Sequence, residues 1–219
     1  MIETDPLILV AQGGVVVYPL LLCSVVSVTI IFERLWSLTR GARQVNRLQR
    51  EVDESLGDRS LAEVVAICRR DRSPLGAVYR AVLASASAGT ETRARIAQRK
   101  LGEANRRLRR FVWLLGTIGS LAPFIGLFGT VIGIIRAFEN MAATGSGGFA
   151  VVAAGISEAL VATAGGLLVG VLSIFAYNAF QVRISTLLAE WREQTDEFLA
   201  HLADAPPVAE THPRVVQSR

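Results

Sequence analysis

The stretch that decides the fold is residues 149–182, which read FAVVAAGISEALVATAGGLLVGVLSIFAYNAFQV and contain one charged residue, Glu158. A helix needs about 20 mainly apolar residues to cross a bilayer, and this stretch exceeds that length. Two further stretches meet the same criterion. We place transmembrane helices over residues 15–35, 111–138 and 149–182.

The composition supports the same interpretation, because 51% of the residues are hydrophobic and the mean hydropathy is +0.41. We therefore predict an all-α polytopic membrane protein with three transmembrane helices. The second and third are expected to extend as long helices beyond the membrane. The first span is not expected to be a cleaved signal peptide, since residues 1–14 contain no Lys or Arg and no A-x-A site follows.

The distribution of basic residues predicts the orientation. Residues 34–110 carry eighteen Lys and Arg against eight Asp and Glu, whereas residues 1–14 carry only Glu3 and Asp5. Basic residues accumulate on the cytoplasmic side, so both the middle segment and the C-terminus are expected there. Outside the spans we expect a periplasmic interfacial segment at 1–14, a cytoplasmic helical region at 36–110, a periplasmic loop at 139–148, a cytoplasmic helix at 183–204 and a disordered tail at 205–219.

Several function classes are disfavoured. The sequence pI is about 9.7, but the basic residues cluster at membrane edges, where anionic lipids are their expected partners and nucleic acid is not. Cys23 and Cys68 lie in different compartments and form no metal spacing or disulfide framework. No nucleophile, base or cofactor motif appears, so we expect no cofactor, no metal and no enzyme activity.

Small residues occupy one face of each of the two later spans. At about 100° per residue, they gather on one side of each helix, and Gly129 and Gly133 complete a GxxxG that lets helices approach closely. Pro123 removes a backbone hydrogen bond and predicts a kink. The residues expected to pack helices together are Pro123, Gly126, Gly129, Gly133, Gly155 and Gly166.

Glu158 lies at the edge of the small face of the third span. A charge near the bilayer centre costs about 2.5–3.5 kcal/mol even on lenient scales, and such residues are by default functional. Thr130 lies on a small face near the depth of Glu158, and Thr163 lies on a small face about one turn further in. We therefore predict a proton pathway through Thr130, Glu158 and Thr163. Two alternatives remain: threonines that only bond a carbonyl one turn back, and a protonated glutamate with a structural role.

The residues also resemble a known family. The run TIGSLAPFIGLFGTVIGIIRAF at 117–138 and the run VVAAGISEALVATAGGLLVG at 151–170 resemble the ExbB/TolQ/MotA proton channel family, closest to its ExbB and TolQ branch. The resemblance implies a homopentamer in the bacterial inner membrane. It also implies a single-span partner like ExbD or TolR that carries an intramembrane Asp, and a TonB- or TolA-like protein driven by proton flow.

One position departs from the family pattern, because Ala154 stands where many relatives have Pro. Its effect on the helix next to Glu158 is left open, as are H⁺ against Na⁺, the copy number and the envelope system served. Alternatives to an ExbB/TolQ-like energiser are a motility-type stator, a non-conducting scaffold and a solute transporter. A transporter is disfavoured because three spans contain no inverted repeat.

Overall fold

The computed structural model describes residues 16–57, 61–85, 88–144 and 149–204. The predictions for residues 1–14, for 145–148 of the loop and for the tail at 205–219 lie outside those residues. The chain divides into two compact units. Unit 1 comprises Met1–Arg43 and Asn105–Leu187, and unit 2 comprises Gln44–Ala104 and Leu188–Arg219.

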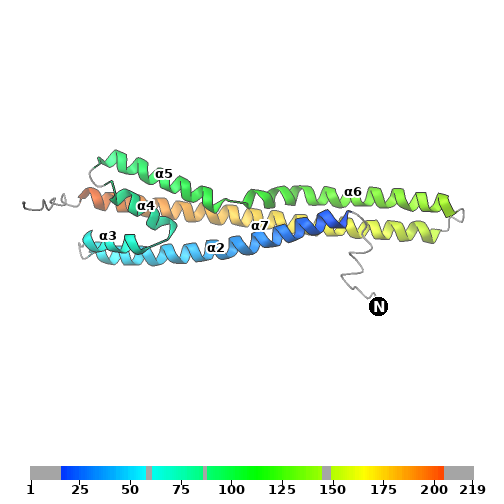
Figure 1. Ribbon diagram of the computed structural model, residues 1–219, viewed down its shortest axis with the longest axis horizontal. Helices are drawn as coiled ribbons and strands as arrows, with labels where there is room; N and C mark the ends of the chain where they lie inside the picture. Colours follow the sequence, from blue (N-terminus) through cyan, green and yellow to red (C-terminus); the bar gives the residue numbers. More distant parts are fainter. Residues whose placement is uncertain (1–15, 58–60, 86–87, 145–148, 205–219) are drawn as a thin grey trace, which may run out of the picture. The chain divides into compact units, whose positions relative to one another are not determined.

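The elements within the described residues are α-helices, as expected (Figure 1). Three of them are long and apolar enough to cross a membrane, with candidate spans in Val17–Ser55, Thr90–Ala142 and Val152–Ala203. The predicted class, an all-α protein with three membrane-spanning helices, is therefore confirmed. The helices are α2 (Val17–Gly57), α3 (Leu61–Arg70), α4 (Pro74–Leu83), α5 (Thr90–Leu108), α6 (Val112–Thr144) and α7 (Phe149–Asp204).

The interior of unit 1 is formed where α2, α6 and α7 meet. Leu20, Ile118 and Ala122 are buried together there. A buried polar contact also joins α7 to α2, in which the Ser173 hydroxyl donates to Ser27 Oγ at 2.9 Å. A hydroxyl buried among apolar groups is costly unless it is bonded, so the two serines satisfy each other.

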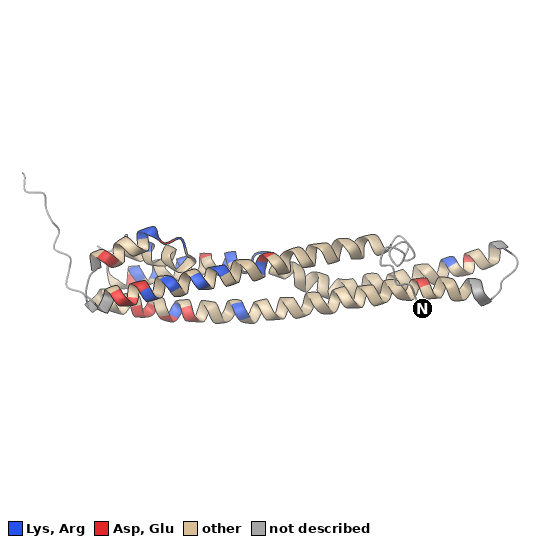
Figure 2. Ribbon diagram, turned by 90° about the horizontal axis from the view of Figure 1, so that it is seen from below, with Lys and Arg blue, Asp and Glu red and all other residues tan. Residues whose placement is uncertain are grey.

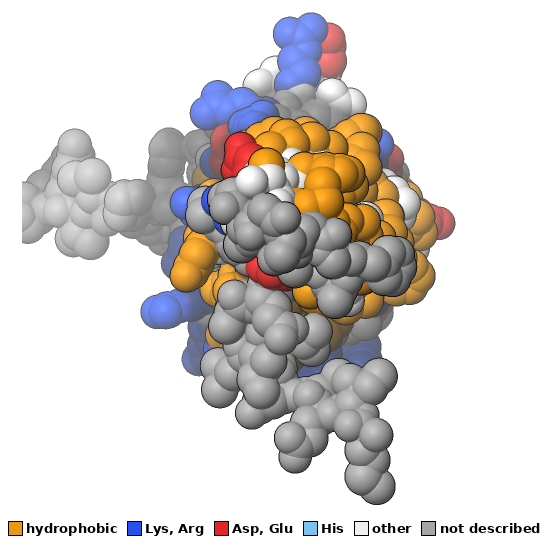
Figure 3. All heavy atoms as spheres, turned by 90° about the vertical axis from the view of Figure 1, so that its right-hand side faces the viewer, with side chains coloured by type: hydrophobic (Ala, Val, Ile, Leu, Met, Phe, Trp, Pro, Cys, Tyr) orange, Lys and Arg blue, Asp and Glu red, His pale blue; other side chains and the backbone are white. Residues whose placement is uncertain are grey.

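The outward faces of unit 1 are apolar. Tyr18 on α2, Phe124 on α6 and Phe175 on α7 expose between 67% and 73% of their surface. Charged residues are sparse on the span segments of these helices and dense on α5 and on the parts of α2 and α7 that belong to unit 2 (Figure 2). Hydrophobic side chains also cover much of the visible face at the α6–α7 end (Figure 3). Such a surface suits lipid or other apolar chains.

Unit 2 has its own core, centred on Tyr79 of α4. The buried Tyr79 ring stacks on Phe198 of α7, with 4.1 Å between ring centroids. Its hydroxyl lies 3.0 Å from Gln49 Oε1 of α2 and 3.2 Å from the Gln194 carbonyl oxygen. One aromatic residue therefore connects three helices.

The start of α4 follows from its sequence. Ser73 is the N-cap, and its side chain accepts the Gly76 amide at 3.0 Å, while Pro74 occupies the first helical position. Ser caps and N1 prolines are the preferred residues at those places. The Ser73-Pro74 pair is therefore a local signal for this helix start.

The helix that leads into the second span differs from the expectation in one respect. The second span is expected to extend beyond the membrane as one long helix, but α5 ends at Leu108 and α6 begins at Val112. Phe111 between them adopts a left-handed conformation with φ of 63°. At its other end α6 continues to Thr144, so residues 139–144, expected in a loop, are helical.

Candidate functional site

The small faces of α6 and α7 pack directly on each other. A Cβ atom added at Gly133 would lie 2.5 Å from Ala159 Cβ, and one added at Gly155 would lie 2.7 Å from Ala137 Cβ. Real Cβ atoms are not found at such distances, so these positions accept only glycine without a shift. The close approach is the one that small residues permit between membrane helices.

The same contact continues along both helices. A Cβ at Gly126 would lie 3.0 Å from Thr163 Cα, one at Gly129 would lie 3.0 Å from Ala162 Cβ, and one at Gly166 would lie 2.6 Å from the Ala122 carbonyl oxygen. Most of the small face is thus covered within one chain. What remains for other molecules is the edge of that face.

Pro123 lies inside α6, which remains one helix through it. Its ring faces Gly170, where an added Cβ would lie 2.8 Å from Pro123 Cγ. The ring fits because α7 has no side chain at that point. The sequence signal for Gly170 is its position four residues after Gly166, which continues the small-residue face of the third span.

The glycine contacts establish the relative levels of the three polar residues. Gly133 faces Ala159, next to Glu158, and Gly126 faces Thr163. Thr130 lies midway between those two glycines, so along the helix axis it falls between the levels of Glu158 and Thr163. Five residues of helix separate the two α7 side chains by about 7.5 Å.

Thr163 bonds across the helix pair. Its Oγ1 donates to the Gly126 carbonyl oxygen of α6 at 2.9 Å, and its side chain is half-buried. This differs from the bond to a carbonyl one turn back on the same helix that membrane threonines often form. The absence of a side chain at Gly126 is what lets the hydroxyl reach the backbone of the other span.

Thr130 behaves in the ordinary way. Its Oγ1 donates to the carbonyl oxygen of Leu127 on the same helix at 2.6 Å, and its side chain is half-buried. The hydroxyl oxygen retains acceptor capacity. Thr130 and Thr163 therefore have different partners, although the sequence treats them alike.

Glu158 is exposed on the surface of unit 1. Within the part of the chain that the structure describes, the ion pairs involve other residues, and no cation lies within pairing distance of this carboxylate. Its neighbour Ala159 is buried against α6 at 4% exposure. The exposed carboxylate therefore lies at the rim of the α6–α7 contact.

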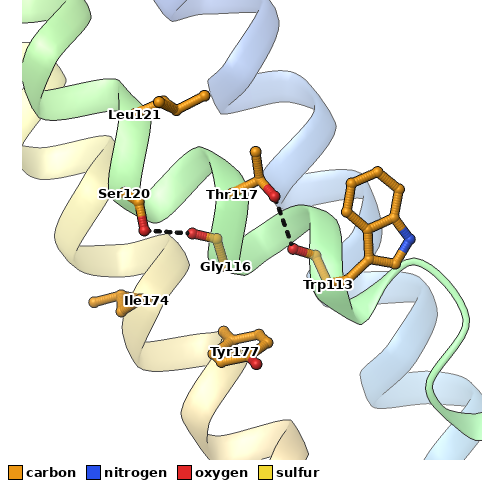
Figure 4. Close-up of a pocket in the computed structure, with 7 residues that line it drawn as sticks. All are labelled: Trp113, Gly116, Thr117, Ser120, Leu121, Ile174 and Tyr177. Atoms are coloured by element: carbon orange, nitrogen blue, oxygen red, sulfur yellow. Dashed lines mark hydrogen bonds between the residues drawn. The ribbon is translucent and has the colours of Figure 1, made fainter.

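The structure also shows a hollow in unit 1 near the start of α6, about 500 Å³ in volume, that the sequence did not indicate (Figure 4). Its polar groups are the hydroxyls of Thr117, Ser120 and Tyr177. The first two donate to carbonyl oxygens of their own helix, at 3.3 and 2.9 Å. The Tyr177 ring covers Gly116, where an added Cβ would lie 3.2 Å away. The remaining lining residues are Trp113, Leu121 and Ile174.

The described residues contain no group of three or more His, Cys, Asp or Glu side chains that could hold a metal ion. The chemistry of the site is therefore that of one carboxylate, two threonine hydroxyls and the backbone carbonyls exposed to them. Such groups can accept, hold and release protons, or bind a small cation. They supply no nucleophile with an adjacent base.

Three apolar helices and this packing define a multi-pass membrane protein. Residues 70–193 match the MotA/TolQ/ExbB proton channel family. The chain is 38% identical to the putative biopolymer transport protein ExbB-like 1 of Synechocystis over 80% of this chain and 68% of that protein. It is 31% identical to ExbB-like 3 of the same organism over 84% of this chain and 89% of that protein. The chain belongs to the MotA/TolQ/ExbB family.

A third relative is more similar over a shorter length. The Tol-Pal system protein TolQ of Pseudomonas aeruginosa is 44% identical over 40% of this chain and 38% of that protein. Similarity thus extends to both the ExbB and the TolQ branch, and the resemblance noted from residues 117–138 and 151–170 is confirmed at the level of the family.

Proposed function

We propose that the chain is an ExbB/TolQ-like subunit of an inner-membrane motor that conducts protons and energises an envelope process. The observation that carries the proposal is the exposed carboxylate of Glu158, the one charged residue in the apolar stretch 149–182. A charge held in a membrane at such cost is expected to serve a path for ions or protons. Along the axis of the α6–α7 pair, Glu158 is followed by Thr130 and then by Thr163, so two hydroxyls lie along the same line as the carboxylate.

The position of Glu158 also suggests how a partner completes the path. Over the residues that the structure describes, α6 and α7 bury most of their small faces against each other, which leaves little room for a polar channel between them. The carboxylate at the rim must meet its exchange group on another molecule. We propose a second copy of the chain, within a pentamer, and a single-span ExbD/TolR-like protein whose intramembrane Asp takes that role.

Orientation and coupling complete the proposal. The excess of basic residues in 34–110 supports a cytoplasmic middle segment, a periplasmic N-terminus and a cytoplasmic C-terminus. The protein driven would be TonB- or TolA-like. The names of the relatives, a biopolymer transport protein and a Tol-Pal system protein, support an envelope process of this kind.

The test is proton uptake by liposomes that contain the membrane complex purified through a tag on this chain. Glu158→Gln keeps the shape of the side chain but removes the titrating group, and should abolish uptake driven by a pH gradient. Glu158→Asp should retain part of it. The matched control is Glu139→Gln, the same substitution at an exposed residue near the far end of α6, and it should conduct normally.

Normal uptake by an assembled Glu158→Gln complex would reject the proton-carrier role. If Glu158→Gln also left the dependent envelope process intact in cells, a non-conducting scaffold would become the better interpretation. Uptake of a solute by the purified chain alone would instead favour a transporter.

A further inference from the structure

The break between α5 and α6 has no cause in the local sequence. Residues 103–115 contain neither Gly nor Pro, the two residues that most often interrupt helices. Even so, α5 ends at Leu108 and α6 begins at Val112. We call residues 109–111 the joint. A contact from elsewhere in unit 1 must hold it open.

That contact is the side chain of Arg34 on α2. Its guanidinium Nη1 donates to the carbonyl oxygens of Arg107 and Leu108, both at 3.2 Å, and the residue is 7% exposed. Its Nε and Nη2 pair with the carboxylate of Glu33. The Arg34 guanidinium thus pairs with a carboxylate through one edge and with two backbone carbonyls through the other.

The two carbonyls are the ones that matter for helix continuity. In an uninterrupted α-helix each carbonyl accepts the amide four residues later, so Arg107 and Leu108 would accept from Phe111 and Val112. Instead the Val112 amide donates to the Arg109 carbonyl oxygen at 3.2 Å, and the Arg110 amide donates to the Arg107 carbonyl oxygen at 3.3 Å. Arg34 therefore bonds both acceptors that a continuous helix would use, and at Arg107 it shares the carbonyl oxygen with the tighter turn of the interrupted backbone.

The joint is held at a backbone cost. Phe111 has φ of 63°, a region where a bulky residue is an outlier and where helix ends normally place Gly or Asn. The Arg110 guanidinium lies 4.6 Å from the Phe111 ring centroid. This contact offsets part of the cost in the interrupted form.

A second arginine fixes the joint to α7. The Arg109 guanidinium donates to Gln181 Oε1, and it also reaches Ser185 Oγ at 3.4 Å. Gln181 in turn donates to the Tyr177 hydroxyl at 2.9 Å. The joint is thus bonded to α2 through Arg34 and to α7 through Arg109.

We propose that the joint is a two-state element that Arg34 holds in its interrupted form. In the other form Arg34 leaves, the amides of Phe111 and Val112 take the two carbonyls, Phe111 becomes helical, and α5 and α6 form one rod. Span one would thereby decide whether movement of span two is transmitted to α5 rigidly. This inference is independent of the proton role of Glu158 and stands on its own contacts.

The experiment is hydrogen–deuterium exchange of the peptide that covers residues 108–115 in the full-length protein in lipid nanodiscs. Arg34→Met frees the carbonyls and should slow exchange of the joint amides about tenfold or more, because a continuous helix protects them. Arg40→Met is the matched control. Arg40 is an exposed arginine on the same helix, stacked on Trp36, and its loss should leave exchange at the joint unchanged.

A second pair of variants isolates the backbone state without touching a charge. Phe111→Ala and Phe111→Gly both remove the ring, but alanine favours the helix and glycine favours the left-handed conformation. Phe111→Ala should slow exchange and Phe111→Gly should not. Equal exchange in this pair, or a folded Arg34→Met protein that exchanges as fast as the wild type, would overturn the proposal. Arg34 would then simply cap a permanent break.

Discussion

The hydroxyl of Thr163 donates a hydrogen bond to the carbonyl oxygen of Gly126 on the neighbouring span, at 2.9 Å. This bond lies within the α6–α7 contact, where a Cβ added at Gly126 would lie 3.0 Å from Thr163 Cα. It means that one of the three polar residues singled out in the spans also holds the two helices together.

Thr163→Val should therefore weaken the helix pair. Valine keeps the shape but loses the donor, and hydrogen bonds between membrane helices contribute about 0.6 kcal/mol on average and at most about 1.7 kcal/mol. Thr163→Ser should retain most of that stability. The measurement is reversible unfolding of the purified protein in mixed micelles.

The control for this bond is Thr130→Val. The Thr130 hydroxyl donates within its own helix, to Leu127, so its removal should change the free energy of unfolding less. An equal loss in both variants would contradict the structural role assigned to the cross-helix bond.

A second prediction uses two adjacent glycines with different surroundings. A Cβ at Gly166 would lie 2.6 Å from the Ala122 carbonyl oxygen, whereas one at Gly165 would meet nothing within 4 Å. Gly166→Ala must push the helices apart and should cost about 1–3 kcal/mol, as overpacking does. Gly165→Ala should be neutral or slightly stabilising, because alanine is the better helix former.

Unfolding in the same mixed micelles would measure both variants. Since the two substitutions are chemically identical and one residue apart, general effects on insertion cancel. Loss of stability at Gly165 as large as at Gly166 would show that the contact with Ala122 is not what makes the glycine necessary.

The spans and the start of α4 could be predicted because their signals are local. A charge-free length identifies the spans, and Ser73 followed by Pro74 identifies a helix start. The site was predictable only in part. The helical wheel assigned Thr163 to a small face, but it could not say that its hydroxyl reaches Gly126, because the rotation of one helix against the other depends on packing along both.

The break at residues 109–111 lay beyond sequence reasoning for a different reason. Every residue there tolerates a helix, and the interruption depends on Arg34, more than seventy residues earlier in the chain. Local preference is overridden by a tertiary contact in such a case. The hollow beside Tyr177 was missed likewise, since it requires Gly116 to lie opposite that ring.

A third prediction concerns the thiol of Cys68 in unit 2. The residue is fully buried, and burial, followed by the nearby Asp71 charge, raises the pKa of its thiol to about 11. At pH 8 a thiol with this pKa is ionised in about one molecule in a thousand, and only the thiolate reacts. In a Cys23→Ala protein, maleimide should label Cys68 very slowly until denaturant is added. Rapid labelling of the folded protein at pH 8 would contradict both the burial and the pKa.

The last prediction concerns Asp53 on the part of α2 that belongs to unit 2. Desolvation raises the pKa of this carboxyl, and the negative charge of Glu197 on α7 adds to the shift, while Gln49 and His201 oppose it. A carboxyl whose pKa is higher in the folded than in the unfolded state favours folding below its unfolded pKa. That contribution is lost as the pH rises through the folded pKa.

Asp53→Asn should therefore make the full-length protein more stable at pH 7 than the wild type and flatten the fall in its stability as the pH rises from the acidic range. The effect should be modest, because the carboxyl remains largely accessible to solvent. Chemical denaturation at several pH values measures it, with the exposed residue Glu54, mutated to Gln, as the control. If the stability of the wild type instead rose with pH over this range, and Asp53→Asn removed that rise, the sign would be reversed and the assignment refuted.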